Sequence, residues 1–231
     1  MNELFKNSLF FGSFLSVAAY WGALKLRQRW NTPLLNPLML SIAFIILFLR
    51  LTGISYEQYD RGARYLTYFI TPATICLALP LYRQFHHLRK NYKAILLAVL
   101  SGTLSGLICI LALAYVMKLN HQQYVTFLPK SITTAIGIDL SEELGGNSTI
   151  TVTAIVLTGI LGSVLGEWIC KVFKIKHPIS VGLALGTASH VIGTSKAMEI
   201  GEIEGAMSSL SVAIAGIMTI VFASLFAGFL R

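Results

Sequence analysis

The sequence predicts an all-α integral membrane protein with about six full spans and two re-entrant or broken-helix hairpins that form an inverted repeat. Of the 231 residues 55% are apolar and only 12% are charged, and long apolar runs recur. A soluble domain typically has about a quarter of its residues charged. Together with a mean hydropathy of +0.71, these observations indicate one transmembrane domain in contact with the lipid bilayer.

Six apolar segments are long enough, or nearly so, to cross a hydrocarbon core of about 30 Å. We interpret the first as a membrane helix and not a signal peptide, because no small-residue cleavage site precedes its basic flank. We expect residues 1–117 to supply the N-terminal spans and scaffold of a single domain over 1–231. The predicted spans are residues 8–24, 34–50, 63–82, 94–117, 149–170 and 206–230.

Basic residues lie in the loops that follow the first, third and fifth predicted spans. Ten of the 18 Lys and Arg are found there, and the net charge is +8. On the positive-inside rule these loops face the cytoplasm, which places the N-terminus outside. We therefore interpret the positive net charge as a signal of membrane topology, and we expect no nucleic-acid partner. The ten residues are Lys25, Arg27, Arg29, Arg83, Arg89, Lys90, Lys93, Lys171, Lys174 and Lys176.

Two polar stretches interrupt the apolar pattern. The topology requires residues 125–148 to start and finish outside and residues 177–205 to start and finish inside. We interpret each as a re-entrant hairpin or a pair of broken half-helices, one entering from each side. The alternative is an ordinary exposed loop. We expect Pro129 in the first stretch and Pro72 in the third span to break a helix, because proline lacks an N–H and clashes with the preceding turn. At Pro72 the alternative is a simple packing kink.

The two polar stretches are similar in sequence. Sliding the chain against itself by 60 residues gives seven identities over residues 131–160, among them Thr134 with Thr194 and Glu142 with Glu202. Because the spans that follow run in opposite directions, the units 125–170 and 177–230 are predicted to form an inverted repeat. Transporters use such repeats to build a midplane site from discontinuous helices, whose N-termini suit anions.

Lys130 and His190 are the basic residues of the two hairpins. Lys130 would supply positive charge for a carboxylate; alternatively it extends outward to the interface from the hairpin mouth. His190 would bind an anion or pass a proton; alternatively it is a neutral histidine hydrogen-bonded to a nearby group. Small hydroxyls and glycines near them offer donors and close approach, or simply pack helices together. These neighbours are Ser131, Thr133, Thr134, Thr187, Ser189, Gly193, Thr194 and Ser195.

Glu142 and Glu202 occupy matched positions of the repeat. They are candidates for symmetric gates or ion sites, and otherwise are solvated helix ends. The sequence has no phosphate loop, no dinucleotide-binding glycine motif and no cluster with metal-ligand spacing. We therefore expect no enzyme activity, no cofactor and no metal site.

Four motifs resemble the LrgB/CidB family, over roughly residues 30 to 225. One departure is Ala135, which stands where the family usually has proline after the paired threonines, and it bears on how sharply the first half-helix breaks. The motifs are NPLML at 36–40, PATICLALPLY at 72–82, LPKSITTAIG at 128–137 and GLALGTASHVIGTSKAMEIGEIEGAMSSL at 182–210.

The resemblance implies a bacterial inner-membrane protein with a smaller partner of the LrgA/CidA type. It implies a holin- or antiholin-like role in murein hydrolase activity and autolysis, while relatives are also associated with transport of pyruvate, glycolate and glycerate. The positions that match the family motifs are Lys130, Ser131, Thr133, Thr134, Ser189, His190, Gly193 and Thr194.

Two functions follow from these observations. The first is secondary transport of a small monocarboxylate such as pyruvate or glycolate, at a site where the hairpins meet, in what we expect to be a homodimer. The second is holin- or antiholin-like regulation of autolysis with the small partner. An accessory subunit whose polar segments only dock that partner is a third alternative.

Overall fold

The computed structural model describes residues 10–30, 36–76 and 78–230, and every regular element in these ranges is a helix. The chain forms two compact units, Met1–Cys76 and Leu77–Arg231. The boundary falls inside the stretch that was expected to be one scaffold, residues 1–117. Residues 8–9 of the first predicted span and 34–35 of the second lie outside the described residues.

One helix of the first unit, Pro37–Thr52, is capped at both ends. The Asn36 side chain accepts hydrogen bonds from the first free N–H groups of its helix, and Pro37 occupies the first turn, where its missing N–H is not needed. Gly53, at φ 66°, ends the same helix in the left-handed conformation. The elements are α2 (Phe11–Arg29), α3 (Pro37–Thr52), α4 (Tyr56–Ala63), η1 (Arg64–Phe69) and α5 (Ile70–Cys76).

The core of the first unit is small and its outer surface is apolar. Phe11, Leu15 and Ile54 are buried together where α2 meets the turn after α3. Phe44 and Leu51 on α3 are 50% and 78% exposed. Large apolar side chains that face outward along a helix are what lipid contact requires and water disfavours.

The predicted span over residues 63–82 does not begin as an α-helix. A 3₁₀ segment, η1, leads into α5, and α6 (Ala78–Arg83) is the first helix of the second unit. Pro72 lies in the first turn of α5, where backbone N–H groups have no intrahelical partner. The chain thus changes helix type just before this proline.

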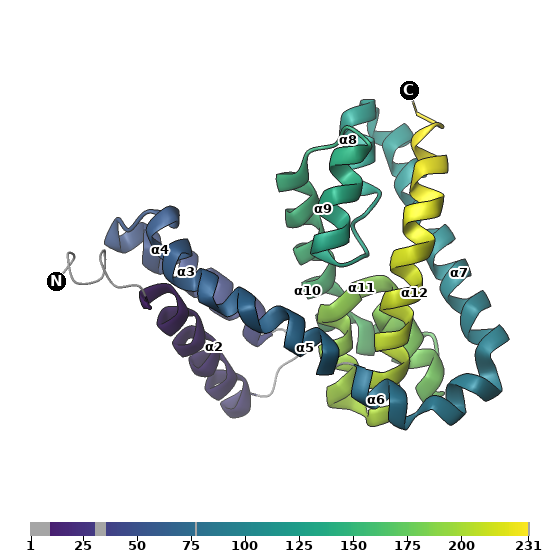
Figure 1. The fold of residues 1–231 in the computed structure, drawn as a ribbon, viewed down its shortest axis with the longest axis horizontal. Helices are drawn as coiled ribbons and strands as arrows, with labels where there is room; N and C mark the ends of the chain where they lie inside the picture. Colours follow the sequence, from purple (N-terminus) through teal and green to yellow (C-terminus); the bar gives the residue numbers. More distant parts are fainter. Residues whose placement is uncertain (1–9, 31–35, 77, 231) are drawn as a thin grey trace. The chain divides into compact units, whose positions relative to one another are not determined.

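The second unit contains the long helices (Figure 1). Residues Arg89–Met117 of α7, together with α10 and α12, are the described helices that are long and apolar enough to cross a membrane, at 29, 25 and 26 residues. A helix of 25 residues is about 37 Å long. The elements after α6 are α7 (Phe85–Met117), α8 (His121–Phe127), α9 (Thr134–Glu143), α10 (Ser148–Val172), α11 (Pro178–Ile200) and α12 (Glu202–Ala227).

Helices α8 and α9 form a first hairpin, which we call hairpin 1 (residues 121–143). It begins beside the end of α12, because His121 bonds the carbonyl of Leu230 and the Tyr124 hydroxyl donates to that of Phe226. The chain leaves hairpin 1 at the same end of α12. The N–H of Asn147, which follows the hairpin, donates to the hydroxyl of Thr126 in its first arm at 2.9 Å. Its two arms are separated by the non-helical residues 128–133.

Helix α11 is a second hairpin, hairpin 2 (residues 178–200), folded at Ser189 and His190, which leave the helical region. A methyl group at Gly193 would collide with the carbonyl of Leu185, eight residues earlier, so the two arms lie against each other. The chain also returns to where it began, because Gly182 touches the backbone of Glu204 near the start of α12.

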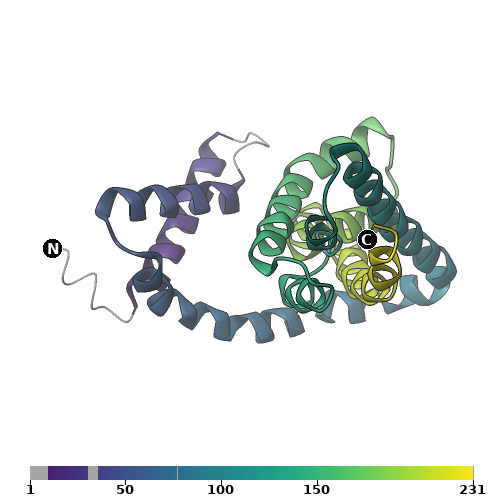
Figure 2. The ribbon, with the colours of Figure 1, turned by 90° about the horizontal axis from the view of Figure 1, so that it is seen from above.

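The hairpins therefore occupy opposite ends of α12, which is about 39 Å long for its 26 residues. Tyr124 and Leu128 of hairpin 1 pack with Ala223 near the end of α12. Leu183 of hairpin 2 packs with Met207 near the start of α12. Figure 2 views this unit from the end where the chain finishes, with α11 and α12 between α10 and α7.

Candidate functional site

A cavity of about 590 Å³ lies in the second unit, between the buried apolar cluster around hairpin 1 and the one around hairpin 2. On α12 it is lined by Ala215 and Thr219, near the middle of that helix. Both hairpins contribute to its wall, with residues from the break of hairpin 1 and from the first arm of hairpin 2. The other lining residues used below are Gly102, Thr103 and Cys109 of α7, Lys130, Ser131 and Thr187.

Lys130 brings a positive charge to this cavity. It follows Pro129, which has no N–H with which to continue α8, so the chain leaves the helix here. The ammonium group donates a hydrogen bond to the Ser131 hydroxyl at 3.0 Å. Among the described residues no carboxylate lies within ion-pair distance of it. A half-buried ammonium whose hydrogen-bond partner among the described residues is one neutral hydroxyl is suited to an anionic ligand.

Thr103 and Thr187 also line this cavity. They are only 7% and 9% exposed, and neither hydroxyl oxygen has a hydrogen-bond partner. Thr187 is one of the hydroxyls around His190 that the sequence pattern indicated, whereas the pattern did not indicate Thr103. A lone threonine in an apolar run carries no local signal that distinguishes a cavity wall from a packed helix face.

His190 does not line this cavity. Its Nε2 donates to the carbonyl of Ile155 on α10 at 2.9 Å, and the ring rests over Gly159. The residue is buried and adopts φ 43° and ψ −138°, a strained backbone conformation for a residue with a side chain. The contact agrees with the alternative interpretation, a histidine hydrogen-bonded to a nearby group, and a role of His190 in ligand binding stays a prediction.

The neighbours of His190 pack hairpin 2 together. Ser189 lies directly against Gly162 of α10, where no larger residue would fit. The Thr194 hydroxyl donates to the carbonyl of His190 at 3.1 Å and pairs with the Ser208 hydroxyl at 2.9 Å. Ser189, Gly193 and Thr194 thus hold the fold of the hairpin and are not among the residues that line the cavity.

Thr133 and Thr134 mark the start of the second arm of hairpin 1. Thr133 precedes the first helical residue of α9, but its side chain makes no capping hydrogen bond. Both residues are half-buried and neither belongs to the cavity wall. Of the eight positions that match the family motifs, the structure brings Lys130 and Ser131 to the cavity.

Glu142 and Glu202 lie at opposite ends of the second unit, away from the cavity lining. Both are exposed, and Glu202 faces Arg83 across 3.9 Å. This placement agrees with solvated helix ends. Among the described residues, no three His, Cys, Asp or Glu side chains come together to hold a metal ion.

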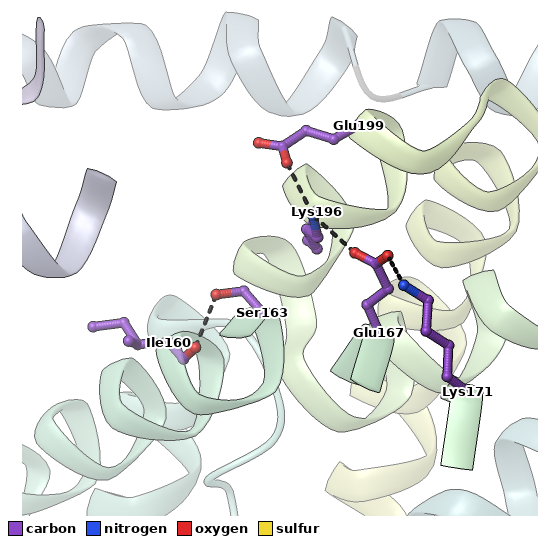
Figure 3. A network of polar contacts seen from close by, with 6 residues as sticks. All are labelled: Ile160, Ser163, Glu167, Lys171, Lys196 and Glu199. Carbon is purple, nitrogen blue, oxygen red and sulfur yellow. Dashed lines mark hydrogen bonds and ion pairs between the residues drawn. The ribbon is translucent and has the colours of Figure 1, made fainter. Parts of the chain in front are cut away.

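A network of charged side chains ties the second arm of hairpin 2 to α10 (Figure 3). The Lys196 ammonium lies 3.2 Å from one Glu167 oxygen and 3.3 Å from Glu199. The other Glu167 oxygen pairs with Lys171 at 2.8 Å. Lys196 is only 20% exposed, so this contact is better shielded than an ordinary surface ion pair.

Hairpin 1 is held by neutral hydroxyls in place of charges. The buried Thr151 hydroxyl of α10 lies 2.8 Å from the carbonyl of Thr126 and 2.7 Å from the Ser141 hydroxyl. These contacts join both arms of the hairpin to α10. Because each polar group has a partner, the cluster is stable in a low-dielectric interior.

Comparisons with known proteins agree with the resemblance noted in the sequence. The model of the LrgB-like family matches residues 16–229. The chain is 35% identical over 222 residues to the antiholin-like protein LrgB of Bacillus cereus strain B4264, and the alignment covers 96% of each chain. The antiholin-like protein LrgB of Bacillus anthracis strain CDC 684 matches with the same identity and coverage. No solved structure matches this chain.

Proposed function

This chain belongs to the LrgB-like family, and from that premise we propose an antiholin-like role in the bacterial inner membrane. The relatives that support this role are named antiholin-like proteins and align along nearly the whole chain. They favour the second hypothesis drawn from the sequence, regulation of murein hydrolase activity and autolysis, over transport. A small partner of the LrgA/CidA type and a homodimer remain part of this proposal.

Carriage of a small monocarboxylate is the molecular activity we propose for the same protein. The observation that carries it is Lys130, a charge without a carboxylate partner among the described residues, in a cavity near the middle of the long helices. A lysine at membrane depth costs about 2.5–3.5 kcal/mol on insertion scales, so its retention there calls for a ligand or a partner. The flux of such an acid would then influence lysis indirectly.

An inverted repeat would support carriage, and we infer it from the 60-residue similarity: the helix after each hairpin approaches the first arm of that hairpin at corresponding positions. The Thr151 hydroxyl of α10 bonds the carbonyl of Thr126 in hairpin 1. Sixty residues later, Ser211 of α12 lies directly against Gly186 in hairpin 2. With the hairpins at opposite ends of α12, each would open or close one side of the cavity, as alternating access requires.

Uptake by purified protein in proteoliposomes tests carriage. We expect saturable uptake of labelled pyruvate or glycolate, accelerated when unlabelled acid is preloaded inside. Lys130→Ala should abolish it, whereas Lys90→Ala, which removes an exposed lysine at the start of α7, should not. Leakage that neither saturates nor distinguishes among solutes of similar size would overturn carriage and leave the holin-like alternative.

Autolysis in cells tests the antiholin-like role separately. In a Bacillus strain that lacks its own antiholin-like protein, expression of this chain should slow detergent-induced lysis, measured as loss of optical density. If carriage underlies this role, Lys130→Ala should fail to slow lysis although the protein reaches the membrane in equal amount. Unchanged lysis with well-expressed wild-type protein would contradict the antiholin-like role.

A further inference from the structure

Thr103 and Thr187 have hydroxyl oxygens that are buried and have no hydrogen-bond partner among the described residues. A threonine in a membrane helix usually donates its hydroxyl to a carbonyl one turn earlier. Thr52, Thr153 and Thr194 do so, at 2.8, 3.0 and 3.1 Å. The hydroxyls of Thr103 and Thr187 make no such bond and have no other partner, although both residues lie within helices.

These two threonines come from different helices that touch at this point. The methyl group of Thr187 packs on Gly102, where an added Cβ would lie 2.9 Å from it. Thr103 is the next residue of α7, and both threonines line the cavity that also holds Lys130. Both threonines therefore border the same space as Lys130, and their hydroxyl oxygens are buried beside it without a partner.

We propose that Thr103 and Thr187 bind a second oxygen of the ligand and select short carboxylates that carry a hydroxyl or carbonyl oxygen. This inference rests on the proposed carriage function, in which Lys130 holds the carboxylate. A hydroxyl can donate to a ligand carbonyl or accept from a ligand hydroxyl, so the pair suits either substituent. An unsubstituted acid of the same length would leave both threonine hydroxyls buried and unpaired, which is unfavourable.

Cys109 provides a way to measure binding directly, because it is an exposed thiol on the wall of the same cavity. A bound ligand should slow its reaction with a maleimide. The measurement uses the full chain in nanodiscs with Cys76→Ser, which removes the other exposed thiol, while Cys170 is buried. The probes are glycolate with acetate and lactate with propionate, each pair differing by one hydroxyl.

We expect wild-type protein to be protected at lower concentrations of glycolate and lactate than of acetate and propionate. Thr103→Val and Thr187→Val should each weaken protection by the hydroxy acids roughly fivefold, about the effect of one hydrogen bond of 1 kcal/mol. They should leave protection by the unsubstituted acids unchanged. Lys130→Ala should weaken protection by all four acids.

Stability provides a second readout that separates binding from a structural role. Removing a buried hydroxyl that has no partner should leave the unfolding temperature of the ligand-free protein unchanged or raise it. Thr103→Ser and Thr187→Ser keep the hydroxyl and should retain the preference for hydroxy acids. Thr153→Val is the matched control, because that exposed hydroxyl bonds its own helix.

The outcomes distinguish this inference from carriage itself. Equal protection by hydroxy and unsubstituted acids, or a preference that survives both valine substitutions, would overturn the role of the two threonines while carriage stands. Destabilised valine variants with an intact preference would show the hydroxyls to be structural. No protection by any of the four acids at concentrations that saturate uptake, or no uptake at all, would overturn carriage through this cavity.

Discussion

Hairpins 1 and 2 each have a basic residue at equivalent positions, yet the two side chains make different contacts. Lys130 and His190 are sixty residues apart, the offset at which the two halves align, and each lies where its hairpin folds. Lys130 lines the cavity, and its hydrogen-bond partner among the described residues is the neutral Ser131 hydroxyl. His190 turns to α10 and donates to the carbonyl of Ile155.

The difference follows from the width of the two breaks. Hairpin 1 leaves the helix over residues 128–133, because Pro129 cannot donate to the preceding turn. Hairpin 2 has Ser189 at the matched position and folds at two residues, with His190 in a positive-φ conformation. The wide break leaves a side chain available to a ligand, and the tight break uses its polar groups to hold the fold.

The largest expected effect comes from the closely packed glycines of hairpin 2. Gly182 touches the backbone of Glu204, which cannot move aside as a side chain can. Gly182→Ala should therefore lower the free energy of unfolding by about 3 kcal/mol or more. In hairpin 1, Gly137→Ala meets the flexible end of Ile155 at 2.5 Å and should be milder. Thermal unfolding in detergent measures both.

A control for this pair is Gly106→Ala, since nothing lies within 4 Å of the added methyl group. That variant should unfold at the wild-type temperature. Equal stability of Gly182→Ala and Gly106→Ala would show that hairpin 2 does not depend on close approach to α12.

The second prediction separates the roles of the two basic residues, binding for Lys130 and stability for His190. Lys130→Ala should weaken carboxylate binding by about tenfold to a hundredfold, because a hydrogen bond to a charged group contributes about 1.5–3 kcal/mol. His190→Ala should change binding by less than about twofold but lower the free energy of unfolding by about 1–2 kcal/mol. Cys109 protection and thermal unfolding report the two effects.

A loss of binding in a folded His190→Ala protein would contradict the structural role assigned to His190. His190→Asn sharpens the test, since asparagine tolerates positive φ better than alanine and keeps a donor. It should be more stable than His190→Ala.

The third prediction concerns the hydroxyls that join each hairpin to the following helix. Thr151→Val removes contacts with Thr126 and Ser141 in hairpin 1 and should lower the free energy of unfolding by about 1–2 kcal/mol. Ser211→Ala should have a smaller effect, because that hydroxyl donates to Ser208 within its own helix. Denaturation of both variants in the same detergent tests the order, and the reverse order would contradict it.

The smallest expected effect comes from the charges of hairpin 2. Glu167→Gln weakens the contacts with Lys196 and Lys171 and should lower the free energy of unfolding by about 0.5 kcal/mol at low salt. Because salt screens partly exposed charges, the difference should shrink at high ionic strength. Glu142→Gln in hairpin 1, an exposed residue, is the matched control and should show no change. A difference unaffected by salt would argue against an electrostatic cause.

Local patterns in the sequence determined the membrane helices and the places where polar segments interrupt them. Hydropathy predicted α7, α10 and α12, and Pro129 predicted the break after α8, because apolar run length and a missing N–H act within a few residues. The 60-residue similarity likewise indicated that the breaks at Lys130 and His190 correspond. The family was evident from motifs that lie in these segments.

Only the tertiary structure decided which polar side chains face the cavity. His190 and Lys130 are alike in sequence context, and the position of the Ile155 carbonyl, on a helix distant in sequence, separates their roles. Thr103 became a candidate because its hydroxyl is unpaired and it lines the same cavity as Thr187, which lies 84 residues later. Side-chain direction and hydrogen-bond satisfaction depend on neighbours brought together by folding, and no local pattern records them.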